Sequence, residues 1–203
     1  MTGSCKGAAK PAPGAVPVPL AGQVMHRRGL IDRLTAYAPA DAEQVATARR
    51  IRDFVAANAD CFERSLRVGH VTGAAWIVDR ERTRALLTHH RKLDRWLQLG
   101  GHADGDPDVL AVALREAHEE SGLDELRVVS EEIFDVDVHP IPARGDEPAH
   151  LHYDVRFLLE ASPAEPLTIS VESKSLAWVA LDEVAALNAD RSVLRMVEKS
   201  ACR

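Results

Sequence analysis

The chain has 203 residues, of which 46% are hydrophobic and 28% charged, and its formal net charge is −6. This length and composition fit one globular domain of ordinary size with a short extension. The acidic balance argues against a nucleic acid polymer or a membrane surface as the partner, and no apolar stretch approaches the length of a membrane span.

The N-terminal third is expected to hold a tail and two helices. Residues 1–20 contain four prolines and no periodic apolar pattern, which predicts a disordered or loose tail. They also lack an apolar signal core, and the three cysteines form no CxxC pair, so we expect a cytoplasmic protein. Apolar residues recur at helical spacing from Leu30 to Tyr37, and Asp41 is a suitable cap for a second helix. Residues 21–68 are therefore predicted to form a helical appendage.

From residue 69 onward the pattern changes to short strands mixed with helices. We expect strands at 72–79, 84–89, 96–99, 126–138, 152–159 and 177–179, and helices at 108–121, 181–187 and 191–197. Strands mixed with helices predict a sheet covered by helices, of the α/β (α+β) class. We assign residues 69–203 to this single domain.

The predicted helix at 108–121 carries a concentrated acidic face. Glu116 and Glu120 are four residues apart and share one side of the helix, with Glu119 on its flank. Most such faces are simply solvated, but three adjacent carboxylates also suit Mg²⁺, which prefers oxygen ligands. Three features favour the metal-binding interpretation: two glycines come before the helix, Arg115 lies beside Glu116, and a glycine ends the helix.

Residues 101–123 resemble the box of the Nudix hydrolase family, G-x5-E-x7-R-E-U-x-E-E-x-G-U, where U is apolar. The matching residues stand at the required spacing: Gly101, Arg115, Glu116, Ala117, Glu119, Glu120, Gly122 and Leu123. The first glutamate of the box is replaced by Pro107. In the family that glutamate mainly braces the loop and the arginine. The resemblance implies a Nudix-type α/β/α sandwich with a mixed β-sheet, to which the helical appendage is added.

The same resemblance implies an enzyme. Its expected reaction is Mg²⁺-dependent cleavage of the pyrophosphate bond in a nucleoside diphosphate linked to another moiety, with Mn²⁺ as an alternative ion. One competing hypothesis is a non-catalytic Nudix-fold nucleotide-binding or regulatory module, which Pro107 slightly favours. Another is an isoprenoid diphosphate isomerase, but that class needs a cysteine just before the box, and residues 96–102 contain none. The expected partners are a small-molecule diphosphate substrate and, in a homodimer, a second copy of the chain.

The resemblance also assigns roles to individual residues. It implies that the metal ligands are Glu116, Glu119, Glu120 and the carbonyl of Gly101 or of the glycine before it. Arg115 is expected to orient Glu116 through a charge-assisted hydrogen bond, so both are counted as catalytic residues.

The third predicted catalytic residue is Glu172, the candidate general base. It lies in a polar loop before a predicted strand, where a solvent-facing glutamate is an equally good interpretation. Pro107 either begins the long helix with Asp106 as cap, or lies just outside it with Asp108 as cap. In both cases we expect Asp106 or Asp108 to brace Arg115.

His102 and Arg95 are the candidate substrate-binding residues. The chain has nine histidines, and His139, His150 and His152 are close together in sequence. A second metal or a phosphate contact is one interpretation of these histidines. Polar strand and loop residues are the preferred one, because no single segment shows metal-site spacing.

Overall fold

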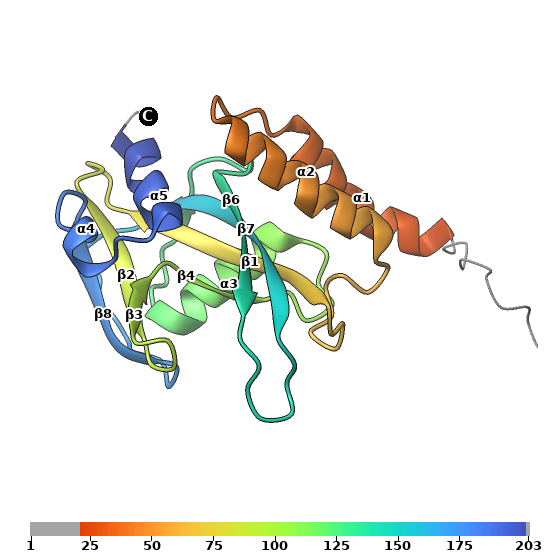
Figure 1. The fold of residues 1–203 in the computed structure, drawn as a ribbon. Helices are drawn as coiled ribbons and strands as arrows, with labels where there is room; N and C mark the ends of the chain where they lie inside the picture. Colours follow the sequence, from red (N-terminus) through yellow and green to blue (C-terminus); the bar gives the residue numbers. More distant parts are fainter. Residues whose placement is uncertain (1–20, 202–203) are drawn as a thin grey trace, which may run out of the picture.

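The structure is a computed structural model that describes residues 21–201. The predicted tail at 1–20 lies outside the described residues. The elements, shown in Figure 1, are α1 (Ala21–Ala36), α2 (Ala42–Ala57), β1 (Gly69–Val78), β2 (Arg84–His90), β3 (Arg95–Leu97), β4 (Leu99–His102), α3 (Val109–Ser121), β5 (Arg127–Val128), β6 (Asp135–Ile141), β7 (His150–Glu160), β8 (Ser173–Ala180), α4 (Val184–Leu187) and α5 (Arg191–Ala201).

Eight strands form one mixed sheet, the type of sheet that the resemblance implied, whereas the sequence predicted six strands. The central path runs β3-β2-β1-β7-β5, while β4 pairs with β1, β6 with β7 and β8 with β2. The β1–β7 pair is parallel and the other pairs are antiparallel. Helix α3 packs against one face of β1, and α5 covers part of the opposite face (Figure 1). The expected α/β/α arrangement is therefore confirmed.

The two N-terminal helices share a core with the sheet. Leu34 of α1 and Ile51 of α2 are buried in one apolar cluster with Val71 of β1 and with residues of α3 and β7. The ring of Phe54 stacks on Tyr153 of β7, with ring centroids 3.7 Å apart. Burying a large apolar side chain contributes about 1.5–3 kcal/mol, so this shared core fixes the helices on the α3 side of the sheet.

Capping residues define the ends of the helices. The Asp41 carboxylate accepts a hydrogen bond from the Glu43 amide at the start of α2, which confirms the predicted cap. Asp108 caps α3 by accepting from the Ala111 amide, so Pro107 lies just outside the helix. Gly122 ends α3 in the left-handed conformation, with φ of 69°, as its position predicted.

The prediction of a single strand at 126–138 is wrong. This segment is divided into β5 and β6, which both pair with β7. The Val129 amide donates to the carbonyl of Leu158 and the Phe134 amide donates to that of Arg156. The four residues between Val129 and Phe134 therefore lie opposite a single residue of β7, Phe157, and they leave the sheet in a short turn. That turn includes a hydrogen bond from the Glu132 amide to the Ser130 hydroxyl.

A buried ionic network ties α5 to the sheet. Asp135 of β6 is fully buried and forms ion pairs with Arg156, Arg195 and Lys199. Lys199 also donates to the hydroxyl of Tyr37, which joins α5 to the end of α1. Removing one partner of such a buried network is strongly destabilising, because it leaves an uncompensated charge in the interior.

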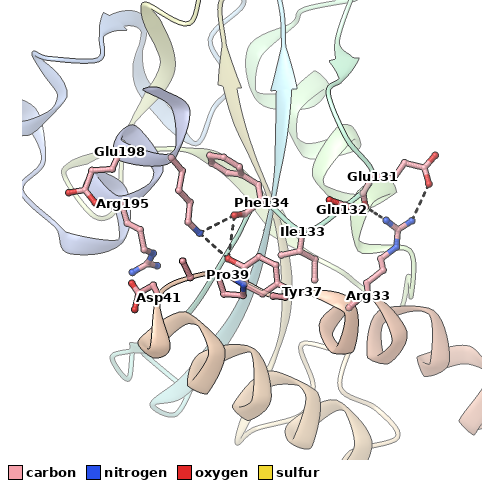
Figure 2. A pocket seen from close by; sticks show the side chains of 14 residues that line it. Arg33, Tyr37, Pro39, Asp41, Glu131, Glu132, Ile133, Phe134, Arg195 and Glu198 are labelled. Carbon is pink, nitrogen blue, oxygen red and sulfur yellow. Dashed lines mark hydrogen bonds and ion pairs between the residues drawn. The ribbon is translucent and has the colours of Figure 1, made fainter. Parts of the chain in front are cut away.

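A pocket of about 760 Å³ lies beside this network, between the N-terminal helices and α5 (Figure 2). Its lining includes Arg33, Tyr37, Glu131 and Lys199. No residue of the acidic box at 101–123 lines it. The pocket is therefore separate from the candidate catalytic residues.

Candidate active site

The candidate site is built where β4 meets α3. Gly101 of β4 is paired with Gly73 of β1, on the face of the sheet that α3 covers. A Cβ placed on Gly101 would lie 2.3 Å from Oε2 of Glu116. Since real Cβ atoms essentially never come so close to another atom, only glycine allows the β4 main chain to approach this carboxylate.

Glu120 is held by the preceding residue of the same strand. The Gly100 amide donates a 3.0 Å hydrogen bond to Oε2 of Glu120, and the Glu120 side chain is buried. Gly100 has φ of 156°, and a Cβ at this position would lie 2.6 Å from the main chain of Ala74. The two consecutive glycines thus let β4 contact both Glu116 and Glu120.

Arg115 holds Glu116 in position. Its guanidinium donates 2.9 Å hydrogen bonds to Oε1 of Glu116 and to the carbonyl of His102, and it lies 4.0 Å from a Glu119 oxygen. The Arg115–Glu116 hydrogen bond is the one expected from the sequence. Within the described residues no direct hydrogen bond or ion pair joins Arg115 to Asp106 or Asp108, so the expected bracing by one of them stays a prediction. Their carboxylates instead accept hydrogen bonds from main-chain amides at the start of α3.

Burial raises the pKa of the two inner carboxyls. Loss of hydration is the largest effect on Glu120 and raises its pKa to about 7, with further increases from the charges of Glu116, Glu172 and Glu119. The hydrogen bond from Gly100 acts in the opposite direction. The pKa of Glu116 is also raised, mainly by burial, although Arg115 lowers it. A cation between these groups would relieve their repulsion.

Glu119 and Glu172 are the more exposed members of the predicted set. Glu119 lies on the outer side of α3, with 65% of its side chain exposed. Glu172 immediately precedes β8 and is close enough for its charge to raise the pKa of Glu120. Arg91 fixes the Glu172 loop: its amide donates to the Glu172 carbonyl, and its guanidinium donates to the carbonyls of Val171 and Ser173.

The two predicted substrate-binding residues lie in different places. Arg95 is exposed at the start of β3. The ring of His102 lies on the sheet face opposite α3, where its centroid is 4.9 Å from that of His70 and 5.1 Å from that of His152. Only the His102 carbonyl reaches the Nudix-like helix, through Arg115.

Two residues near the carboxylates were not singled out from the sequence. Arg64 precedes β1 and forms an ion pair with Asp104, which follows β4. The charge of Arg64 interacts with Glu116 and Glu172, and that of Asp104 with Arg115. No motif marks either residue, because they meet across 40 positions of the chain. A pattern-based analysis of the sequence has no signal for such a pair.

The three box glutamates are brought near one another but are not tightly clustered. Across residues 21–201, one group of three potential ligand side chains has all of its ligand atoms within 4.8 Å, and that group consists of histidines. The residue types and the raised pKa values still fit a hard cation that takes oxygen ligands.

Comparisons with known proteins agree with this geometry. The model of the NUDIX domain family matches residues 69–198. The chain therefore belongs to the NUDIX domain family, the class of Nudix-type pyrophosphohydrolases. No curated protein matches the sequence.

No helix within the described residues is long and apolar enough to cross a bilayer.

Solved structures share the fold at low sequence identity. A C. elegans Ap4A hydrolase binary complex is 17% identical, with a TM-score of 0.53, and the match covers 65% of this chain and 95% of that one. The E. coli dihydroneopterin triphosphate pyrophosphohydrolase is 18% identical, with a TM-score of 0.50 and coverage of 64% and 92%. The M. smegmatis Nudix hydrolase RenU is 22% identical, with a TM-score of 0.50 and coverage of 66% and 88%.

Proposed function

We propose that the chain is a Mg²⁺-dependent hydrolase that cleaves the pyrophosphate bond of a nucleoside diphosphate linked to another moiety. The observation that carries this proposal is the pair Glu116 and Glu120, which approach the main chain of two glycines and have raised pKa values. Within the described residues, Arg115 is the one cationic side chain hydrogen-bonded to this pair. The pair therefore retains negative charge that a divalent cation would neutralise.

The proposed metal ligands are Glu116, Glu119, Glu120 and the carbonyl of Gly101 or Gly100. Carboxylate and carbonyl oxygens are the donors that Mg²⁺ prefers, and Mn²⁺ accepts the same set. When bound, the ion neutralises the diphosphate and polarises the bond that breaks.

The proposed chemistry of the side chains is a hydrolysis. Arg115 keeps Glu116 directed toward β4. Glu172 accepts a proton from the attacking water while the oxygen of that water bonds to one phosphorus. The bond between this phosphorus and the bridging oxygen breaks, and the other half of the substrate leaves as a phosphate monoester that keeps the bridging oxygen. Arg64 and Arg95, as exposed cations, would contact the phosphates of the substrate. His102 would support substrate binding from its position behind β4. A homodimer remains a prediction.

A panel of substrates tests this function. Purified protein is incubated with Mg²⁺ and ADP-ribose, UDP-glucose, Ap4A or dihydroneopterin triphosphate, and the products are separated by chromatography. We expect a nucleoside monophosphate from at least one nucleoside diphosphate derivative, and no reaction in EDTA. If no member of the panel is hydrolysed while a nucleotide still binds, the non-catalytic binding module is the correct description.

Replacing Glu172 with Gln tests the proposed base. The substitution removes the carboxylate but little volume, so we expect the rate to fall by about 10²- to 10⁴-fold with little change in melting temperature. Glu183→Gln is the matched control, since Glu183 makes no side-chain capping bond at α4. An unchanged rate in Glu172→Gln would assign the base to another residue and leave the metal requirement standing.

A further inference from the structure

A second group of ligand-type side chains lies on the sheet face opposite α3. In the parallel β1–β7 pair His70 is directly opposite His152, and in the β6–β7 pair His139 is opposite His152. Cross-strand partners point to the same face of a sheet, and so do residues two apart in one strand. His150 therefore joins the same group, and His102 enters it from β4. Sequence spacing alone does not indicate this group, because its members come from different strands.

Three of these histidines form a compact site. One ring nitrogen from each of His70, His150 and His152 lies within 4.8 Å of the other two. His70 is 1% exposed and His150 6% exposed. Two of the three side chains are thus almost completely removed from solvent.

The inward-facing nitrogens lack hydrogen-bond partners. The carbonyl of Pro148 accepts a 2.9 Å hydrogen bond from Nδ1 of His150, which leaves the Nε2 of that ring as a lone-pair donor. This Nε2, the Nε2 of His152 and both ring nitrogens of His70 are buried without a hydrogen-bond partner. The Leu66 carbonyl lies close enough to His70 to oppose the effect of burial on its pKa. Leaving buried polar atoms without partners is unfavourable, and a bound ligand would satisfy them.

Two of the three rings are in the protonation state that a metal ligand needs. Burial is the largest cause and the charges of neighbouring histidines add to it, so that the pKa of His70 is lowered to about 4 and that of His152 to about 2. Near neutral pH these imidazoles are therefore uncharged, and each keeps a lone pair for coordination.

The spacing of the rings fits a single tetrahedral ion. The centroid of His70 is 4.9 Å from those of His150 and His152, which are 5.2 Å from each other. With bonds of about 2.0–2.1 Å, each ring centre lies roughly 3.2 Å from the ion, which places tetrahedrally arranged rings about 5.2 Å apart. Rotation of the side chains, without movement of the strands, would bring the nitrogens to bonding distance.

We propose that His70, His150 and His152 bind a transition-metal ion of the Zn²⁺ class, at a site separate from the carboxylates of the box. Imidazole nitrogen suits Zn²⁺ and poorly suits Mg²⁺, so the two sites differ in ion preference. A carboxylate oxygen of Glu147 lies 3.8 Å from Nε2 of His150, and the His102 ring lies beside His70 and His152, so both are candidates for a fourth ligand. The ion would link the start of β1 to the start of β7, across β4 from Glu116.

Metal titration tests the site without any activity assay. Tag-free protein in excess Mg²⁺, which occupies the carboxylates, is titrated with Zn²⁺ against a chromogenic competitor. We expect one Zn²⁺ per chain in the wild type and in Glu120→Gln, and at least about 100-fold weaker binding in His70→Asn and His152→Asn. His89→Asn is the matched control, because His89 pairs with Asp94 outside the group.

Cobalt spectroscopy on the wild-type protein covers the case in which the buried variants misfold. Co²⁺ held by three imidazoles gives the intense visible absorption of a tetrahedral ion, which Zn²⁺ should remove by displacement. A weak octahedral spectrum, no Zn²⁺ binding beyond the carboxylate site, or full binding in a folded His152→Asn protein would overturn the proposal. Loss of Zn²⁺ binding in Glu120→Gln would assign the ion to the box instead.

Discussion

At Gly101 the main chain of β4 leaves no room for a side chain beside Glu116, one of the candidate catalytic carboxylates. In Gly101→Ala the new methyl group would collide with Glu116, whose carboxylate must then move away from β4. We expect the rate to fall by about 100-fold or more, because small misplacements of reacting groups have effects of this size. Steady-state kinetics measure the loss.

Gly29→Ala is the control for this substitution. Gly29 is exposed within α1, and a Cβ there meets nothing within 4 Å. Since alanine is the better helix former, we expect this variant to be stabilised by about 0.5–1 kcal/mol with its rate unchanged. A Gly101→Ala enzyme as active as Gly29→Ala would show that the close approach has no catalytic role.

Glu120 also makes stability depend on pH. Its folded pKa of about 7 is above its ordinary value of 4.5, because burial disfavours the charged form of the carboxyl. The contribution of Glu120 to the free energy of unfolding is fully present below pH 4.5, and it is lost as pH rises through 7. In metal-free protein at pH 8, Glu120→Gln should therefore be more stable than the wild type, by on the order of 2–3 kcal/mol. The difference should disappear at pH 4.

Urea unfolding at the two pH values in EDTA measures this difference. Glu119→Gln is the matched control, because Glu119 is exposed and should change stability little at either pH. A Glu120→Gln protein that is equally stable or less stable than the wild type at pH 8 would mean that burying the ionised Glu120 carboxylate does not destabilise the fold.

At the scale of elements, the sequence predicted the ends of α3 but not its surroundings. Capping is a local property, so Gly122 was readable from the chain and Asp108 was one of the two candidate caps that it offered. The hydrogen bond that holds Arg115 could not be predicted from the sequence, because its acceptor is a main-chain carbonyl of another element. The division of the expected strand at 126–138 likewise depends on its register with β7, which local propensity does not encode.

Pro107 gives a prediction at this scale. It lies outside α3, so its replacement of the usual glutamate leaves the helix and its carboxylates in place. Restoring the glutamate in Pro107→Glu should change the rate by about tenfold or less, which corresponds to 1.4 kcal/mol of barrier. Parallel kinetic assays of the two proteins on the same diphosphate measure the change. An inert wild type beside a strongly active Pro107→Glu variant would show that this chain had lost catalysis.

At the scale of the whole molecule, the fold was predicted through the resemblance of residues 101–123 to the Nudix box, a segment that holds a loop, a helix and an acidic face together. A metal site at the histidines was left as the less preferred interpretation, because β1 must pair with β7 in register before His70 meets His152. Contacts of the helices α1 and α2 with the sheet were also not predicted, although their apolar faces were. Long-range contacts of this kind depend on topology, which a single sequence constrains weakly.

The central claim is that the box carboxylates bind the ion on which hydrolysis depends. The most direct test compares the wild type with Glu120→Gln on the best diphosphate substrate, with Mg²⁺ and with EDTA. We predict that turnover in the wild type requires the cation and that Glu120→Gln, although folded, is slower by on the order of 10³-fold or more. Full activity in EDTA, or a Glu120→Gln enzyme as fast as the wild type, would contradict the account.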